Sequence, residues 1–277
     1  MKITNQRIVI TGAAGGIGTA LCRKLAGAGA QLLLVGRKPA ALAELTQALK
    51  NTHPQTQTAW LALDITAPDA PSRLRDEAMT LLGGIDILVN NAGMPGFCVF
   101  AETPPQEIER LLATNLTAPL LLTRAVLPDL LARRQGGIVN IGSTFGAIGF
   151  PWFSAYSGAK FGLRGFSEAL RRELAGSGVA VLYAAPRATR TAINDERVTA
   201  MGTATGMPFD EPDEVAGRIV AAMLRGDAEC AIGAQEGFFA RLNGLLPRLV
   251  DKGLAAKARA MAPFARRLAI DNPPTEI

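Results

Sequence analysis

Tyr156 and Lys160 have the residue types and the spacing of a proton-transfer pair. Residues four apart on a helix lie on the same face, so the two side chains are expected to be neighbours. A free tyrosine has a pKa of about 10 and is a poor acid or base at neutral pH. A nearby ammonium group favours tyrosinate, so Lys160 is predicted to lower the pKa of Tyr156. The pair alone also fits a packing aromatic whose hydroxyl finds any partner.

A glycine-rich segment at residues 11–18, TGAAGGIG, follows an apolar run and opens an alanine- and leucine-rich stretch. Gly12, Gly16 and Gly18 let the backbone approach a pyrophosphate at a helix N-terminus, where free N–H groups favour an anion. A glycine loop by itself also fits a structural turn, but a strand before it and a helix after it favour a dinucleotide site. The predicted cofactor contacts in this loop are Gly12, Ala14, Gly15, Gly16, Ile17 and Gly18.

The segment Gly36-Arg37-Lys38 stands where a site for NAD usually carries an acid that binds the ribose 2′-hydroxyl. This segment has two cations and no carboxylate. The guanidinium of Arg37 matches a 2′-phosphate, so we expect NADP(H) to be preferred over NAD(H). The alternative is an ordinary solvated cation after a strand.

Short apolar runs alternate with helical stretches along the chain. These elements must position the tyrosine–lysine pair, the glycine loop and Arg37. The runs lie at 7–11, 31–35, 58–63, 85–90, 137–141, 179–185 and 229–233. Strands that are apolar throughout and separated by helices indicate a parallel sheet covered on both faces. We predict an α/β fold with a doubly wound, Rossmann-type, seven-stranded parallel sheet in three α/β/α layers. One helical region is expected over about residues 104–134.

The chain is expected to hold one domain, with residues 1–236 as the catalytic part and 237–277 as a C-terminal helical extension. From Gly237 to Ile270 there are seven Lys or Arg against one acid, Asp251. Apolar residues recur there near helical spacing, which predicts one or two basic amphipathic helices. Since the rest of the chain is about neutral, the composition argues against nucleic-acid binding.

Other site types find little support. His53 is the only histidine and no G-x-S-x-G motif occurs, which argues against a Ser-His-Asp hydrolase. The three cysteines (Cys22, Cys98 and Cys230) lie far apart without a CxxC motif, so reduced thiols and no metal site are expected. Residues 1–6 do not read as a signal peptide, and no apolar run reaches the ~18 residues of a membrane span. A cytoplasmic protein is expected.

The order and spacing of several motifs resemble the short-chain dehydrogenase/reductase family, single-domain type, over about residues 5–235. The motifs are TGxxxGxG at 11–18, LDIT at 63–66, NNAG at 90–93, Asn115, Ser143 and Tyr156-x-x-x-Lys160. The resemblance implies that Tyr156 gives a proton to a carbonyl oxygen during reduction, or takes one from an alcohol. It implies that Lys160 also holds the nicotinamide ribose, that Ser143 binds the substrate oxygen and that Asn115 keeps a water linking Lys160 to solvent.

The same resemblance implies further cofactor contacts. Asp64 would meet the adenine amino group, although an N-cap or turn acid is a competing interpretation. NNAG would lie beside the adenosine half of the cofactor. The remaining contact residues implied are Ile65, Asn91, Ala92, Gly93, Tyr156, Lys160, Pro186, Thr189 and Thr191.

Arg187 stands where the family usually has glycine after the sixth strand. It is either a tolerated surface side chain or a cation offered to the cofactor or to an acidic substrate.

Apolar residues dominate the segments expected to wall the substrate site, at 94–100, 145–153 and 201–209. They include Phe97, Phe150, Trp152, Met201 and Met207, and they suggest a small lipophilic carbonyl or alcohol. The extension could cover the cleft, pair subunits, or make peripheral membrane contact through residues 237–270. A homo-oligomer, dimer or tetramer, is expected from the resemblance.

The resulting hypothesis is an NADP(H)-dependent oxidoreductase that interconverts a lipophilic ketone or aldehyde and its alcohol. Two alternatives remain at this point. One is a 3-ketoacyl-thioester reductase, and the other is a non-catalytic NADP(H)-binding regulator on the same fold.

Overall fold

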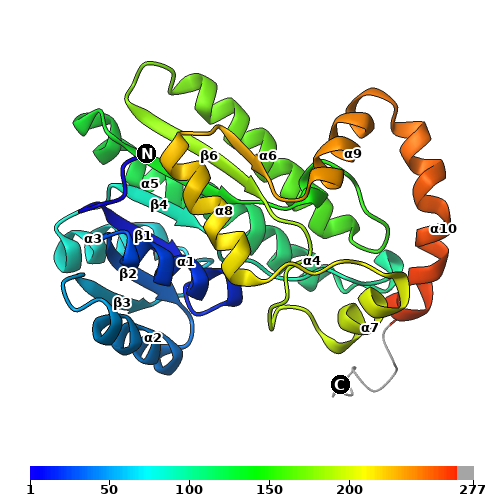
Figure 1. The fold of residues 1–277 in the computed structure, drawn as a ribbon, viewed down its shortest axis with the longest axis horizontal. Helices are drawn as coiled ribbons and strands as arrows, with labels where there is room; N and C mark the ends of the chain where they lie inside the picture. The colour runs from blue at the N-terminus through cyan, green and yellow to red at the C-terminus, as the bar shows by residue number, and fades with distance from the viewer. Residues whose placement is uncertain (267–277) are drawn as a thin grey trace.

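The protein is built on a parallel sheet with strand order β3-β2-β1-β4-β5-β6-β7. The computed structural model describes residues 1–266, apart from the side chains of 234–236. Its strands are β1 (Arg7–Thr11), β2 (Gln31–Gly36), β3 (Thr58–Ala62), β4 (Ile87–Asn90), β5 (Gly136–Ile141), β6 (Val179–Ala185) and β7 (Glu229–Ala231). This confirms the predicted doubly wound sheet and all seven predicted strands among the described residues (Figure 1).

Helices cover both faces of the sheet, because side chains of one strand alternate between the faces. Ile8 and Ile10 of β1 pack with α1 (Gly16–Gly27), α2 (Pro39–Thr52) and α8 (Pro212–Arg225). Val9 points to the other face and joins α3 (Ala70–Leu82), α5 (Ala118–Arg133) and α6 (Ser154–Glu173). Two apolar cores, one on each side, therefore hold the sheet in the middle layer (Figure 1).

The helical region expected at 104–134 is divided into three pieces. The α4 helix (Pro105–Leu112) leads into a π-helical turn (Ala113–Thr117), and α5 follows. By length and composition, Pro105–Arg133 is also the one described helix that could cross a membrane. Its apolar side chains Leu122, Val126 and Leu130 are fully buried against the sheet, as in a core helix.

The strand order places a switch point at the carboxyl ends of β1 and β4. The chain runs from β1 to β2 on one side, while β4 pairs with the other side of β1. Ligands of doubly wound sheets bind in the crevice at this point. The glycine loop follows β1 and the NNAG segment follows β4, so the fold brings both to this crevice.

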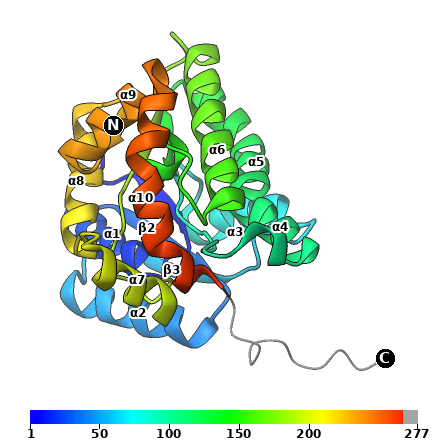
Figure 2. The ribbon, with the colours of Figure 1, turned by 90° about the vertical axis from the view of Figure 1, so that its right-hand side faces the viewer.

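The C-terminal extension forms two helices, α9 (Ala234–Leu245) and α10 (Pro247–Ala265). A further helix that was not expected, α7 (Glu196–Thr205), lies in the loop between β6 and α8. The α10 helix packs against α7 and α9 and crosses one end of the molecule (Figure 2). It buries Met261 and Ala265 in a third, mostly aromatic cluster, which includes Phe97, Phe153 and Tyr156.

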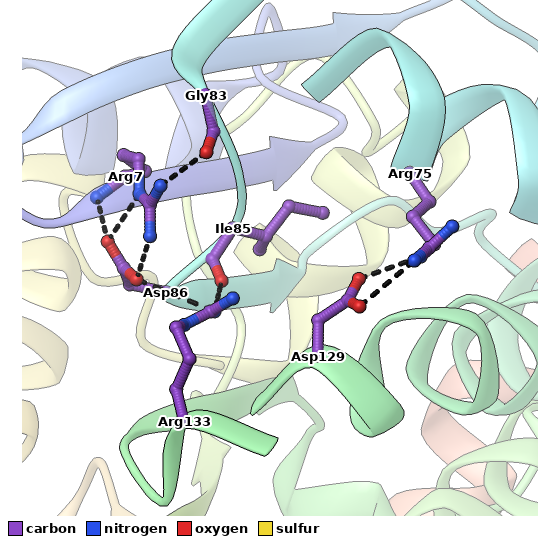
Figure 3. Close-up of polar contacts among 7 residues, drawn as sticks. All are labelled: Arg7, Arg75, Gly83, Ile85, Asp86, Asp129 and Arg133. Atoms are coloured by element: carbon purple, nitrogen blue, oxygen red, sulfur yellow. Dashed lines mark hydrogen bonds and ion pairs between the residues drawn. The ribbon is translucent and has the colours of Figure 1, made fainter. Parts of the chain in front are cut away.

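Paired charges occupy the opposite end of the sheet, where the strands begin. Arg7 of β1 donates through Nε and Nη2 to the carboxylate of Asp86, at 2.8 and 2.7 Å. Arg133, at the end of α5, lies 3.5 Å from the same carboxylate and also donates to the carbonyl of Ile85. The network ties β1, the start of β4 and α5 together (Figure 3).

Candidate active site

The α6 helix presents Tyr156 and Lys160 on one face, as their spacing predicts. Lys160 Nζ lies 5.7 Å from the centre of the Tyr156 ring. The same ammonium donates to the carbonyl oxygen of Ile141, the last residue of β5, at 2.9 Å. Lys160 is only 5 % exposed, so its ammonium group is buried, and the carbonyl to which it donates carries no charge.

Burial dominates the ionisation of both groups. It lowers the pKa of Lys160 to about 8. Burial also raises the pKa of Tyr156, and the hydrogen bond with the Ser143 side chain only partly opposes it. The sequence-based prediction that Lys160 lowers the pKa of Tyr156 therefore does not hold in this structure. The physical reason is that desolvation disfavours tyrosinate, while the ammonium is directed at the Ile141 carbonyl.

Ser143 follows β5 and begins a short 3₁₀ turn (Thr144–Gly146). Its Oγ accepts a hydrogen bond from the backbone N–H of Phe145 at 3.1 Å. One lone pair is thus engaged, and the hydroxyl proton can donate to the Tyr156 oxygen or to a substrate oxygen held beside it. This geometry suits the role predicted for Ser143.

Asn115 is completely buried in the π-helical turn. Its Oδ1 accepts from Met94 N at 2.7 Å and its Nδ2 donates to Met94 O at 2.9 Å. The side chain therefore holds the segment that follows β4. A Cβ on Gly93 would lie 3.3 Å from Asn115 Oδ1 and 4.0 Å from Lys160 Nζ, so these groups adjoin. The predicted water of Asn115 stays a prediction.

The glycine loop has the shape of an anion cradle. Gly12 adopts a φ of +64°, and a Cβ there would come within 2.8 Å of Ala92 Cα. A Cβ on Gly18 would lie 2.2 Å from the Gly12 carbonyl oxygen. Gly15 is the N-cap of α1, without a side-chain cap bond, and the first turn has no acid. Free amides at a helix N-terminus fit a pyrophosphate, so the residues present fit a dinucleotide.

The loop segment after β4 supports this cradle. Asn91 Nδ2 donates to the carbonyl oxygens of Thr11 and Gly12, at 3.0 and 3.1 Å. The amide donors of Asn91 are thus used within the protein, and a cofactor contact of its side chain would have to use Oδ1. Ala92 N donates to Thr11 Oγ1 at 3.1 Å, which places this segment directly beside the loop.

Arg37 and Asp64 follow the neighbouring strands β2 and β3, at the edge where an adenosine would lie. Arg37 is exposed. Asp64 Oδ1 accepts from Thr66 N at 2.9 Å and from Thr66 Oγ1 at 2.7 Å, so the turn-acid interpretation is confirmed for this oxygen. These bonds, with the charge of Arg37, lower the pKa of Asp64. Ile65 is buried in the core cluster, which leaves its backbone for the predicted contact.

Arg187 forms a salt bridge that neither sequence-based interpretation foresaw. Its Nη2 lies 2.7 Å from the buried carboxylate of Asp210, and its Nε also donates there. Thr189 pairs with Asp210 as an isolated β-bridge, and its Oγ1 donates to Arg187 O at 3.0 Å. The loop after Pro186 is therefore anchored by Arg187, and it is not a free surface segment.

Thr191 ends this loop against the glycine cradle. A Cβ on Gly16 would lie 2.3 Å from Thr191 Cγ2, so the loop closes over the start of α1. A cavity of about 430 Å³ opens beside it, with a mixed polar and apolar lining. Arg190, Thr191, Asn194, Met207 and Phe209 are among its walls. The predicted contact residue Thr191 thus lies at one crevice with the glycine loop.

Aromatic rings pack around Tyr156. Phe145 and Phe150 stack at 4.4 Å between ring centres, and Phe153 lies 6.2 Å from Tyr156. Phe97 and Met201 are buried, so they belong to the packed cluster more than to an open wall. The ring nitrogen of Trp152 donates to the carbonyl of Ala258 in α10 at 2.9 Å. The α10 helix therefore packs on the aromatic cluster that contains Tyr156, and the role of the extension stays a prediction.

Sequence reasoning missed Tyr183 on β6. Its hydroxyl contacts the backbone of Ser143 and the carbonyl of Lys160, beneath both residues. A signal was available, since Tyr183 is one of only two tyrosines in the chain. Because Tyr183 lies within a uniformly apolar strand, the sequence indicated only a core residue there.

Comparison with known proteins finds one family over most of the chain. The model of the short chain dehydrogenase family matches residues 6–202. "Dehydrogenase/reductase SDR family member 7B" of Bos taurus is 33 % identical over 93 % of this chain and 82 % of that protein. The ketoacyl reductase HetN of a Nostoc strain is 33 % identical over 83 % and 79 %. The 3-oxoacyl-[acyl-carrier-protein] reductase FabG of Vibrio cholerae is 32 % identical over 79 % and 90 %.

Solved structures share the fold. A short chain dehydrogenase/reductase from Burkholderia phymatum, in complex with NAD, superposes with a TM-score of 0.82 at 21 % identity, over 90 % of this chain and 96 % of the other. A short-chain dehydrogenase from Streptomyces avermitilis superposes with a TM-score of 0.77 at 27 % identity, over 92 % and 99 %.

Proposed function

The chain belongs to the short-chain dehydrogenase/reductase family and is an oxidoreductase of CH–OH and C=O groups. We propose that it reduces a lipophilic ketone or aldehyde with NADPH, or catalyses the reverse oxidation. One observation carries the proposal. Ser143, Tyr156 and Lys160 converge at the carboxyl end of β5, beside the glycine cradle and under an aromatic wall.

The residues of the chain divide the chemistry between them. A bound nicotinamide supplies or accepts the hydride. Ser143 donates a hydrogen bond to the substrate oxygen and holds it beside the Tyr156 hydroxyl. In reduction, Tyr156 gives its proton to that oxygen as the carbonyl becomes an alcohol; in oxidation the proton returns. The raised pKa of Tyr156 keeps this hydroxyl protonated at neutral pH, which suits the reductive direction.

Preference for NADP(H) is supported by the charges at the end of β2. Arg37 is exposed there, close enough to Asp64 to affect its ionisation, and residues 36–38 contain no acid. Arg37→Asp should shift the ratio of kcat/KM values toward NADH by at least tenfold, because a 2′-phosphate would then meet a carboxylate. An unchanged ratio would contradict the NADP(H) preference while leaving the oxidoreductase assignment intact.

Turnover of a panel of ketones, aldehydes and alcohols, followed at the nicotinamide absorbance band, tests the activity. Lipophilic substrates are expected to be preferred, because the wall beside Tyr156 consists of Phe145, Phe150 and Phe153. Tyr156→Phe should lower kcat by about 10²-fold or more, since the general acid is lost, while cofactor binding persists. A variant with undiminished turnover would overturn the role of Tyr156.

A 3-ketoacyl-thioester reductase is the second candidate, favoured by the named activities of the relatives HetN and FabG. Acetoacetyl-CoA in the same panel distinguishes it: kcat/KM far above that of simple ketones would favour the thioester. A non-catalytic regulator on this fold would bind NADPH and turn over nothing, and Tyr156→Phe would not change its effect.

Self-association is also proposed. An apolar groove of about 330 Å³ between α5 and α6 is lined by Leu120, Leu127, Leu131 and Phe166 among others, and Leu121 and Phe161 are exposed. A second copy of the chain would bury these side chains. Light scattering should give a dimer or tetramer, and a monomer at micromolar concentration would contradict this.

A further inference from the structure

In the described part of the extension, large apolar side chains are exposed along α9 and at the start of α10. Leu245 is 80 % exposed and Phe238 is 63 % exposed. The others are Phe239, Leu246 and Leu249, all about half exposed. Five such side chains within twelve residues exceed the scattered apolar exposure of an ordinary surface. We call these five side chains the turn patch.

Cations surround the turn patch. Arg241 of α9 and Arg248 and Lys252 of α10 are exposed in the same stretch of the chain. Asp251 is the only acid among residues 237–266. A second copy of the chain bound through a two-fold axis would place the cations of one patch close to those of the other, which is repulsive. Anionic lipid headgroups complement them, and acyl chains accept the leucines and phenylalanines.

The patch is continuous with the roof of the active site. Next to it, α10 buries Val250, and further along it buries Met261 in the aromatic cluster with Tyr156. Asn243 of α9 donates to the carbonyl of Ala147, in the segment between Ser143 and Tyr156, at 3.0 Å. The patch therefore lies on two helices that are joined to Ala147 and to the aromatic cluster, and α10 crosses this end of the molecule (Figure 2).

We propose that the turn between α9 and α10 docks on an anionic lipid surface through the turn patch and its cations. This inference does not depend on the identity of the substrate.

Co-sedimentation of the full chain with vesicles tests it. Vesicles of phosphatidylglycerol and phosphatidylcholine should pellet the protein at low salt, and vesicles of phosphatidylcholine alone should bind at least tenfold more weakly. The double variant Leu245→Ser/Leu249→Ser should lose most of the binding, and Arg248→Glu should weaken it about fivefold. Leu224→Ser and Arg23→Glu, exposed on α8 and α1, are the matched controls and should bind as the wild type does.

Two results would overturn the proposal. One is equal binding to both vesicle types or to none. The other is light scattering in which the double variant dissociates an oligomer, because the turn patch would then join two copies of the chain. Unchanged NADPH binding by the double variant shows that loss of pelleting does not reflect unfolding.

A second inference concerns Tyr183, whose hydroxyl is buried under the catalytic residues. It accepts from Ser143 N at 3.3 Å and lies 3.2 Å from Ser143 O and 3.5 Å from Lys160 O, to which it can donate. It thereby joins the end of β5 to α6, the two elements that carry Ser143 and Lys160.

Two glycines make room for this tyrosine. A Cβ on Gly142 would lie 2.1 Å from Tyr183 Cζ, and a Cβ on Gly146 would lie 2.2 Å from its hydroxyl oxygen. The ring thus fills a slot that no side chain at 142 or 146 could share. Such close packing restrains the hydroxyl to one position.

We infer that Tyr183 is a positioning residue, which holds Ser143 and Lys160 at the separation that the reaction needs. This inference rests on the proposed function. Tyr183→Phe keeps the ring and removes the hydroxyl, so buried backbone groups of Ser143 and Lys160 lose a partner.

Steady-state kinetics separate positioning from support of the fold. Tyr183→Phe should lower kcat about tenfold, change the KM for NADPH much less and leave the folded fraction unchanged, because most of the cofactor cradle lies on other elements. Unchanged kcat, or a loss explained fully by unfolding in circular dichroism, would overturn the inference. Absence of turnover in the wild type would instead contradict the proposed function itself.

Discussion

Both ends of the parallel sheet carry ionisable side chains, but they pair them differently. At the amino end, the carboxylate of Asp86 pairs with Arg7 and with Arg133 across three elements (Figure 3). At the carboxyl end, Lys160 is more deeply buried and its bonded partner is the neutral carbonyl of Ile141.

The pKa values record this difference. Burial raises the pKa of Asp86, but the hydrogen bonds and charge of Arg7, with the charge of Arg133, outweigh burial and hold it below its ordinary value. For Lys160, burial alone acts, and its pKa falls from 10.5 to about 8. That fall corresponds to roughly 3 kcal/mol against the charged form. The ion pairs at the amino end therefore stabilise the fold. At the carboxyl end, burial disfavours the charged form of Lys160, which lies beside the tyrosine proposed to transfer a proton.

Lys160→Met should produce the largest effect. Turnover should fall by about 10²-fold or more, because the cation beside Tyr156 and its predicted ribose contact are lost. Stability at pH 7 should not fall, since the desolvated ammonium is removed. Denaturant unfolding and kcat, measured on the same preparation, check the stability and the turnover. A large loss of stability would contradict the claim that the buried charge of Lys160 does not stabilise the fold.

Asp86→Asn should have the opposite profile. It should lower the free energy of unfolding by about 2 kcal/mol, since hydrogen bonds to charged groups contribute roughly 1.5–3 kcal/mol. The kcat per folded molecule should stay as in the wild type, because Asp86 lies at the end of the sheet away from Tyr156. A reduced kcat at full folding would show that the two ends are coupled.

The pH dependence of that same variant sharpens the comparison. The pKa of Asp86 is depressed in the folded state, so its stabilisation is present above the unfolded value, about 3.9, and is lost as pH falls through the folded value. The stability difference between the wild type and Asp86→Asn should therefore shrink between pH 5 and pH 2. Urea unfolding across that range measures it, and a constant difference would contradict the assignment.

Arg75→Ala should have the smallest effect. Arg75 pairs with Asp129 at 2.7 Å, but its side chain is 41 % exposed, so solvent screens the pair. Its unfolding midpoint should stay close to that of the wild type and well above that of Asp86→Asn. An equal loss would mean that the degree of burial does not separate the two ion pairs.

Much of the fold was predictable from local pattern. Apolar runs such as 31–35 and 179–185 became β2 and β6, because a strand buried on both faces needs apolar side chains throughout. The π-helical turn at Asn115 and the α7 helix were not predictable, because neither segment shows a regular spacing of apolar residues that would indicate it. The pairing of Arg187 with Asp210 joins residues 23 apart along the chain, and no sequence spacing encodes it.

The sequence by itself determined the element order, the glycine loop and the identity of Ser143, Tyr156 and Lys160 as candidates, because each depends on short-range spacing. Only the tertiary structure decided their environment. Burial set the pKa directions of Tyr156 and Lys160, the turn of Thr66 occupied one oxygen of Asp64, and α10 closed over the aromatic wall. Desolvation and long-range contacts arise only when distant segments meet, so they are properties of the fold and not of any one segment.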